Sequence, residues 1–361
     1  MTGPDDERFA STDRSAARRR TLLRSTAGVA ATGVLGAAYA DGGTRSADAD
    51  ARRDAVATRT RDGADGAIDA RPPGELTLIA HRGFAGENPE NTVAAAEAAT
   101  SVGGSAGDDT PAGRGADIIE LDVVPTADGD IVVFHDDALS GRDGGRRGLT
   151  DTEGVVWETD TATVTSAEVL DSGETVPRLS RFLDAVPGDV GVNVELKNPG
   201  RADLRFAEKL SEAELADRTA VWLPFVERVV DVLVDHDNEF LCSSFCEGAL
   251  AAIREVSSYA VAPILWESIG DGLAIAREHD AAAVHAPMQL IDRTPFHDPA
   301  LTAGVDLVAL AHAEGRDVNV WTVDTWYQAE RLAEAGVDGI AADYSNLLSR
   351  ATGASTAGSR S

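Results

Sequence analysis

Short apolar runs alternate with helical patterns along most of the chain, from residue 76 to residue 342. Such repeated alternation of strand and helix predicts a parallel α/β architecture. Strands are expected at 76–80, 118–124, 131–135, 192–197, 239–243, 260–265, 282–285, 318–323 and 339–342. Helices are expected at 93–100, 179–185, 202–215, 249–257 and 327–335.

The second and third apolar runs explain why there are nine strands where a (β/α)8 barrel needs eight. Only residues 125–130 separate these runs, which is too short for a parallel crossover. The Asp-Gly pair in this link is a strong signal for a two-residue hairpin turn. If that pair forms the turn, Asp122 lies opposite His135. We therefore expect the third run to be an antiparallel return strand beside an eight-stranded TIM barrel.

Two segments interrupt the alternation. Residues 138–176 are rich in Gly and Asp and show no clear helical period, so we expect them to form an excursion above one rim of the barrel. Residues 103–115 form a shorter polar loop directly before the second strand. The barrel with this excursion is expected to span residues 75–349.

The first forty residues predict an export signal. Arg18-Arg19-Arg20 precede Thr-Leu-Leu-Arg, which resembles a twin-arginine signal, and an Ala-Tyr-Ala cleavage pattern closes the run at Ala40. The intervening run is too short and too rich in Gly for a membrane span of about 20 apolar residues. We expect an exported protein, with a disordered basic N-terminus on a cytoplasmic protein as the alternative. Residues 41–74 and 350–361 predict a disordered linker and tail.

Composition narrows the possible partners. The 361 residues carry a formal net charge of −29, which argues against nucleic acid and anionic membranes as partners. The chain has only two lysines, Lys197 and Lys209, and this acidic, lysine-poor composition is typical of a high-salt environment, where screening weakens self-repulsion. Its two cysteines, Cys242 and Cys246, cannot form a zinc site alone and are interpreted as buried free thiols.

Acidic residues stand inside two of the predicted strands. Period-two alternation puts Glu120 and Asp122 on one face of the second strand, and it aims Glu195 and Lys197 the same way in the fourth. Carboxylates inside a barrel are costly unless they bind a cation, and oxygen ligands suit Mg²⁺ or Ca²⁺. The pattern predicts one divalent metal site, and a solvated strand edge is the alternative.

Histidines and cations surround this predicted metal site. His81 and Arg82 directly follow the first strand, at the barrel end where active sites are built. The expected hairpin register brings His135 beside the metal site, where it can perform acid–base chemistry. Lys197 can hold a phosphate as a point charge. An ordinary surface pair is the alternative for His81 and Arg82.

This inventory fits the cleavage of a phosphodiester. A metal ion polarises the phosphoryl group and activates a hydroxyl, and cations neutralise the charge that develops on the phosphoryl oxygens. Two histidines can share the delivery and removal of protons.

After the first strand, either Asn91 or Thr92 is expected to cap the following helix.

A series of short motifs runs through the chain in order. His-Arg-Gly at 81–83 is followed by Pro-Glu-Asn-Thr, Glu-Leu-Asp-Val, His-Asp and Glu-Leu-Lys. Ser-Ser-Phe at 243–245, Val-Trp-Thr-Val-Asp at 320–324 and a last strand that closes at Asp343 continue the series. Together these motifs, over residues 76–347, resemble the glycerophosphodiester phosphodiesterase family.

The resemblance implies a role for each residue of the predicted site. It implies that Glu120, Asp122 and Glu195 ligate the divalent metal ion. It also implies that His81 and His135 are the acid–base pair. In enzymes of this kind, the glycerol hydroxyl next to the phosphate attacks first and forms a cyclic phosphate, which water then opens.

The resemblance also implies contacts with the substrate. Arg82 and Lys197 would contact the phosphate, and Trp321 would line the glycerol pocket, with plain core packing as the alternative for Trp321. The segment 138–176 matches the inserted cap of the family. Cys246 departs from the family pattern, because an acidic residue commonly stands at that position, and the loop at 103–115 is longer than usual.

The expected function is metal-dependent hydrolysis of glycerophosphodiesters, small-molecule substrates, to glycerol phosphate and an alcohol. One alternative is a phospholipase-type phosphodiesterase that acts on intact lipid and needs an apolar rim. In the cap only the cluster Val155, Val156 and Trp157 could provide such a rim. A second alternative is a barrel that binds phosphate esters without catalysis.

Overall fold

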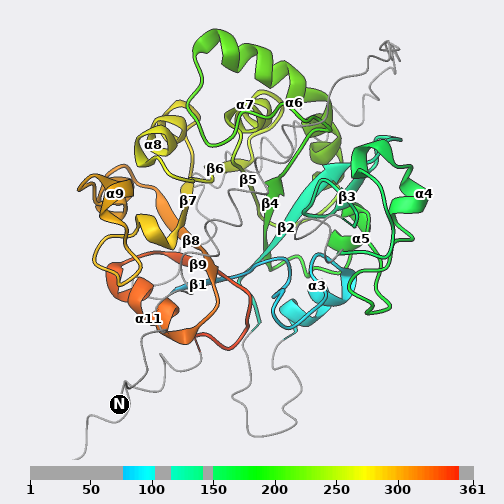
Figure 1. Cartoon of the computed structure of the whole chain (residues 1–361), viewed down its shortest axis with the longest axis horizontal. Coiled ribbons are helices and arrows are strands. Elements are labelled where there is room, and N and C mark those ends of the chain that lie inside the picture. The colour runs from blue at the N-terminus through cyan, green and yellow to red at the C-terminus, as the bar shows by residue number, and fades with distance from the viewer. Residues whose placement is uncertain (1–75, 102–114, 141–148, 349–361) are drawn as a thin grey trace, which may run out of the picture.

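The computed structural model describes residues 76–101, 115–140 and 149–348, which form a parallel barrel surrounded by helices (Figure 1). The strands are β1 (Thr77–Ala80), β2 (Ile118–Pro125), β3 (Ile131–Val133), β4 (Gly191–Leu196), β5 (Phe240–Ser244), β6 (Ala260–Pro263), β7 (Ala283–Pro287), β8 (Asp317–Val323) and β9 (Gly339–Ala342). All nine expected strands are present, with ends that differ from the expected ones by at most two residues. The expected export signal, linker and tail lie outside the described residues, as does most of the loop at 103–115.

The helices lie outside the ring of strands. They are α3 (Val93–Thr100), α4 (Thr161–Val164), α5 (Leu179–Leu183), α6 (Glu212–Leu233), α7 (Glu247–Val256), α8 (Ile269–Glu278), α9 (Pro299–Thr302), α10 (Leu307–Ala313) and α11 (Trp326–Ala335), with short 3₁₀ turns at η2 (Val156–Glu158) and η3 (Met288–Leu290). Among the described residues, no helix combines the length and the apolar character needed to cross a membrane.

The helix expected at 202–215 was wrong. Residues 201–210 are irregular, and α6 begins only at Glu212, after the N-cap residue Ser211. Ser211 and Glu214 form a reciprocal capping box, which satisfies backbone N–H groups that a helix start leaves without partners. The helical spacing before Ser211 therefore belongs to an extended loop and does not form part of α6.

Eight parallel strands form the barrel in the order β6-β5-β4-β2-β1-β9-β8-β7. A parallel bridge between Ile264 and His285, with a hydrogen bond from the Leu265 N–H to the His285 carbonyl, joins β6 to β7 and closes the ring. β3 lies off this ring and pairs antiparallel with β2. The expected (β/α)8 barrel with one extra return strand is confirmed.

Alternation along β2 separates the hydrophobic core from the barrel interior. Ile119, Leu121 and Val123 are fully buried in the main cluster between the strands and the helices. Glu120 and Asp122, one residue out of phase, therefore point to the inside of the barrel. The same strand thus contributes both to the stability of the fold and to a polar interior.

The register of the β2–β3 hairpin differs from the expectation by one residue. Val123 pairs with Val133, and the Phe134 N–H donates to the Asp122 carbonyl, so Phe134 and not His135 lies opposite Asp122. The turn has an extra residue because Gly129 adopts a left-handed conformation (φ 87°), which is typical of a three-residue hairpin with a bulge. His135 consequently lies beyond the end of β3.

The segment after β3 has a small hydrophobic core of its own. Val124, Val132 and Phe134 of the hairpin pack on apolar residues of this segment. The contributors from the segment are Leu139, Leu149, Val156, Val164, Ala167, Val169 and Val176. The described part of 138–176 therefore forms a compact unit on the hairpin, which agrees with a cap inserted after the third strand.

Both cysteines are free and buried, as expected. Burial raises the pKa of the Cys242 and Cys246 thiols to about 12, so both stay protonated at neutral pH. Cys246 is the N-cap residue of α7, but its side chain makes no capping hydrogen bond.

A buried ion pair fixes the irregular loop before α6. The Glu247 carboxylate, fully buried at the start of α7, lies 2.7 Å from Lys209 Nζ and 3.2 Å from His279 Nε2. It also accepts a hydrogen bond from the Leu210 N–H. Although burial raises the pKa of Glu247, these hydrogen bonds and the charge of Lys209 outweigh burial and lower the pKa below its ordinary value.

We expect Glu247→Gln to reduce the free energy of unfolding at pH 7 by roughly 3–5 kcal/mol, because Lys209 then loses its buried partner. A carboxylate with a lowered pKa stabilises the fold above its unfolded pKa of about 4.3, and this contribution is lost as the pH falls through its folded pKa. The difference between the two proteins, measured by denaturant unfolding, should therefore shrink below about pH 4. Glu255→Gln, at an exposed position of the same helix, is the control. A loss that stayed constant with pH would contradict this assignment.

Candidate active site at the barrel mouth

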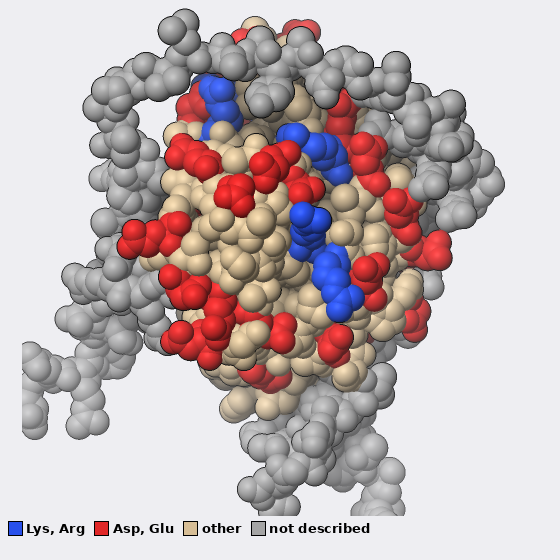
Figure 2. All heavy atoms as spheres, turned by 90° about the vertical axis from the view of Figure 1, so that its right-hand side faces the viewer, with Lys and Arg blue, Asp and Glu red and all other residues tan. Residues whose placement is uncertain are grey.

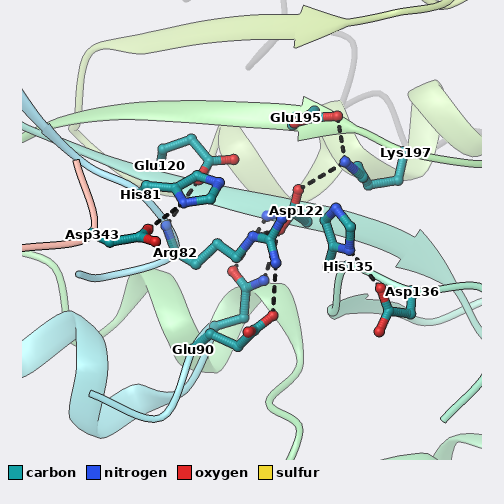
Figure 3. Close-up of polar contacts among 11 residues, drawn as sticks. His81, Arg82, Glu90, Glu120, Asp122, His135, Asp136, Glu195, Lys197 and Asp343 are labelled. Atoms are coloured by element: carbon teal, nitrogen blue, oxygen red, sulfur yellow. Dashed lines mark hydrogen bonds and ion pairs between the residues drawn. The ribbon is translucent and has the colours of Figure 1, made fainter. Parts of the chain in front are cut away.

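The predicted site residues come together at the carboxyl ends of the barrel strands (Figure 3). His81 and Arg82 directly follow β1, and Lys197 directly follows β4. His135 comes from the segment after β3. These residues therefore bring together three separate parts of the chain at the end of the barrel where enzymes of this fold carry their active sites.

Three carboxylates converge in this mouth. Glu120 and Asp122 lie on the same face of β2, and the parallel register of β2 and β4 pairs Asp122 with Glu195. One ligand oxygen from each of Glu120, Asp122 and Glu195 lies within 4.8 Å of the others. The grouping follows directly from strand alternation and register, as expected from the sequence.

The carboxylate oxygens are only partly satisfied. Among the described residues, Glu120 Oε1 and Asp122 Oδ1 are buried and have no hydrogen-bond partner. Burial raises the pKa of Glu120 well above its ordinary value, and the charges of Asp122 and Glu195 raise it further. Burial also raises the pKa of Glu195. Buried carboxylate oxygens that lack hydrogen bonds fit a hard divalent cation, so these three residues could hold one.

Two cations face the carboxylates. Lys197 Nζ lies 2.6 Å from Glu195 Oε1 and 3.3 Å from Asp122 Oδ1. Arg82 Nε lies 3.2 Å from Asp122 Oδ2. Although burial raises the pKa of Asp122, the charges of Lys197 and Arg82 outweigh it and lower the pKa below its ordinary value. Asp122 thus stays ionised between the two cations.

Two residues that hold these groups in place were not recognised from the sequence. Thr92 is the N-cap of α3, whereas Asn91 donates from Nδ2 to Asp122 Oδ2 at 2.8 Å. Glu90 Oε1 lies 2.9 Å from Arg82 Nη1. Both residues belong to the Pro-Glu-Asn-Thr motif, which was interpreted only as a helix start. The motif that begins the helix therefore also orients a carboxylate and a guanidinium.

The turn after β1 needs a glycine at residue 83. Arg82 and Gly83 both have positive φ angles, of 52° and 78°. A Cβ atom added at Gly83 would lie 2.7 Å from Ala95 Cβ and 3.0 Å from its backbone carbon. This tight turn lets the Arg82 N–H donate to Glu120 Oε2 at 2.9 Å. The His-Arg-Gly motif therefore positions a carboxylate through its backbone as well as through its side chains.

Each histidine of the site contacts an aspartate through Nδ1 (Figure 3). His81 Nδ1 lies 2.6 Å from Asp343 Oδ1, and His135 Nδ1 lies 2.6 Å from Asp136 Oδ1. Burial lowers the pKa of His135 to about 4, and Arg82 and Lys197 add to this effect. His135 is therefore neutral at pH 7 and can accept a proton.

Trp321 lies in an aromatic group at the same mouth. Its ring stacks on Trp266, with centroids 6.0 Å apart, and meets Phe245 edge-on at 5.6 Å. Phe206 stacks on Phe245 at 4.4 Å. Trp321 also packs against the small cluster of Ile79, Ile118 and Ala341 inside the barrel. The ring is half-buried, so one part of it packs in the core while another part remains accessible.

A model of the "Glycerophosphoryl diester phosphodiesterase family" matches residues 81–347 of the chain. The chain belongs to this family. The match includes every residue of the predicted site, from His81 to Trp321. Membership in this enzyme family makes the protein a phosphodiesterase.

Individual relatives agree with this assignment. The glycerophosphodiester phosphodiesterase of Bacillus altitudinis is 27% identical over 74% of this chain and 94% of its own length. The enzyme of the same name from Caldanaerobacter subterraneus is 28% identical over 74% of this chain and 93% of its own.

Solved structures support the same fold. An Oleispira antarctica phosphodiesterase in complex with the product sn-glycerol-3-phosphate superposes with a TM-score of 0.57, at 24% identity, over 77% of this chain and 97% of that chain. At this level of identity the likeness concerns the barrel fold.

We expect divalent metal binding to release protons. Burial raises the pKa values of Glu120 and Glu195, and the ionised form of each is the ligand, so binding must displace any proton they hold. Affinity for Mg²⁺ or Ca²⁺ should then fall as the pH falls, by about tenfold per pH unit for each proton displaced. Calorimetry in buffers of different ionisation enthalpy measures the released protons directly. Glu120→Gln should reduce the release, and an affinity independent of pH would contradict the expectation.

Proposed function

We propose that the protein hydrolyses glycerophosphodiesters to glycerol phosphate and an alcohol, with one divalent metal ion, Mg²⁺ or Ca²⁺, held by Glu120, Asp122 and Glu195. The observation that supports this most strongly is the composition of one small site. Three buried carboxylates, two cations and two aspartate-bound histidines face one another at the barrel mouth. The proposed hydrolysis uses all three kinds of group: the carboxylates hold the metal ion, the cations stabilise the phosphoryl group and the histidines transfer protons.

Arg82 and Lys197 bind and stabilise the phosphoryl group in this proposal. Both are held beside Asp122, and the carboxylates outweigh burial to raise the pKa of both cations above their ordinary values. They therefore stay charged while negative charge develops on the phosphoryl oxygens. A divalent cation, when bound, adds positive charge there and lowers the pKa of a neighbouring hydroxyl.

His81 and His135 exchange the protons of the reaction. Because His135 is neutral at pH 7, it can take the proton of an attacking hydroxyl, and a second imidazole can protonate the leaving oxygen. We infer that the attacking group is the glycerol hydroxyl next to the phosphate, which gives a cyclic phosphate that water then opens. The accessible part of Trp321 would contact the carbon atoms of the glycerol.

The cap bears on the alternative of an enzyme for intact lipid. Such an enzyme needs an apolar rim, and Val156 of the cluster that could provide it is fully buried, while its neighbours Val155 and Trp157 are half-buried. The cluster is therefore used largely for packing. This favours a small soluble diester as the substrate.

The test is release of glycerol phosphate from glycerophosphocholine and related diesters in high salt, with and without a chelator. We expect release that depends on the metal and that falls by roughly 10²–10⁴-fold in kcat for His81→Ala and for His135→Ala, with unchanged melting temperatures. His312→Ala is the control, since His312 contacts Asp338, which directly precedes β9 at the opposite end of the barrel. Release from lipid vesicles alone would favour the lipid enzyme, and tight binding without turnover would favour a binding barrel.

A further inference from the structure

The last strand of the barrel delivers a carboxylate to the first histidine. Asp343 directly follows β9, and its Oδ1 lies 2.6 Å from Nδ1 of His81, which directly follows β1 (Figure 3). These two residues are 262 positions apart in the sequence. The parallel pairing of β1 with β9, in which Ala80 lies beside Ala342, brings them together where the barrel closes.

Backbone hydrogen bonds hold Asp343 from both sides. Its N–H donates to the Val323 carbonyl of β8 at 3.3 Å, and its carbonyl accepts from the Gly86 N–H at 2.9 Å. A Cβ atom added at Gly86 would lie 2.8 Å from the Asp343 carbonyl oxygen and 2.5 Å from the Tyr344 ring. The backbone that carries the carboxylate is therefore packed against the loop after β1.

The histidine is held in the same way. The His81 N–H donates to the Ala342 carbonyl of β9 at 3.0 Å, so the backbone of each partner is hydrogen-bonded to a neighbouring strand. The His81 side chain is 17% exposed and that of Asp343 is 26% exposed. Two side chains attached to rigid strand ends can keep a fixed mutual geometry at a modest cost in entropy, which a pair on mobile loops cannot do.

An aspartate at Nδ1 determines which nitrogen of the ring can react. The carboxylate accepts the Nδ1–H, so the neutral ring carries its proton there and Nε2 keeps a lone pair. Nε2 is then the atom that can take and return a proton at the barrel mouth. Without the carboxylate, the ring could rotate away from the mouth or carry its proton on Nε2 in the neutral form, and either change would disturb the proton transfers that Nε2 performs.

We propose that Asp343 is the positioning residue of His81: it fixes the orientation and the tautomer of the imidazole, and it affects the reaction only through that ring. This inference rests on the proposed function in that His81 is taken to transfer protons. The alternative is that the carboxylate only stabilises the junction between β9 and the loop after β1. Experiment can separate these two roles of Asp343, because positioning the ring requires His81 and stabilising the junction does not.

A double-mutant cycle with Asp343→Asn and His81→Ala tests the proposal. We expect Asp343→Asn to lower kcat by about 100-fold with little change in KM, because the substrate still binds but the ring is misplaced. The double variant should be no slower than His81→Ala alone, since Asp343 has nothing left to act on. Independent losses that multiply in the double variant would overturn the proposal.

A second measurement reads the tautomer without any substrate. Nitrogen-15 magnetic resonance of the His81 ring should show the Nδ1–H form in the wild-type protein and a shift toward the Nε2–H form in Asp343→Asn. An unchanged tautomer would also overturn the proposal. If no diester is hydrolysed, the proposed function fails, but the resonance result still decides whether Asp343 controls the ring.

The other end of β9 offers a matched control. Asp338 directly precedes this strand and pairs with His312, whose Nε2 lies 2.8 Å from Asp338 Oδ2. Asp338 Oδ2 also accepts a hydrogen bond from the Val318 N–H. Asp338→Asn therefore breaks an aspartate–histidine pair that is remote from the mouth. It should lower the melting temperature and leave both kcat and the His81 tautomer unchanged. A loss of kcat at both positions would indicate a general effect of damage to β9.

Discussion

The mutual repulsion of three carboxylates at one point dominates the organisation of the barrel mouth. Two unit charges about 4 Å apart repel by roughly 4 kcal/mol at an effective dielectric constant of about 20. Glu120, Asp122 and Glu195 hold ligand atoms within 4.8 Å of one another, so their ionisation requires positive charge nearby. Arg82 and Lys197 supply part of it from within the chain. The proposed divalent cation would supply the rest.

Much of the surrounding structure serves this charge balance. Asn91 orients Asp122, Glu90 orients Arg82, and the backbone N–H of Arg82 holds Glu120. The amino-acid composition also makes positive charge scarce relative to negative charge. Figure 2 shows acidic side chains spread over one face of the molecule, with basic side chains confined to a few patches. In a chain so rich in acidic residues, both lysines form ion pairs with carboxylates that are largely or fully buried, one at the mouth and one with Glu247.

The barrel could be predicted from the sequence because strand alternation and parallel register are determined by local pattern. Glu120 and Asp122 share a face for that reason. The hairpin register could not be predicted, since it depends on one extra residue in the turn at Gly129. The position of His135 was therefore expected for the wrong reason: it reaches the mouth from beyond the end of β3 and not from a position opposite Asp122.

The missed partners have a common explanation. Asn91 resembled a helix cap, and Asp343 resembled the end of a strand, because each occupies such a position. Their contacts with Asp122 and His81 arise only when the ring of strands closes, and local pattern carries no information about closure. The loop before α6 was misinterpreted for a related reason, since its conformation depends on Lys209 reaching Glu247 on another helix.

The most direct test of the charge-balance account is the anomalous diffraction of crystals grown with Mn²⁺ in place of Mg²⁺. The account predicts one strong peak at the barrel mouth, within coordination distance of Glu120, Asp122 and Glu195, with Arg82 and Lys197 still beside Asp122. An active protein whose crystals show no peak at these carboxylates, or show one ligated by other residues, would contradict it.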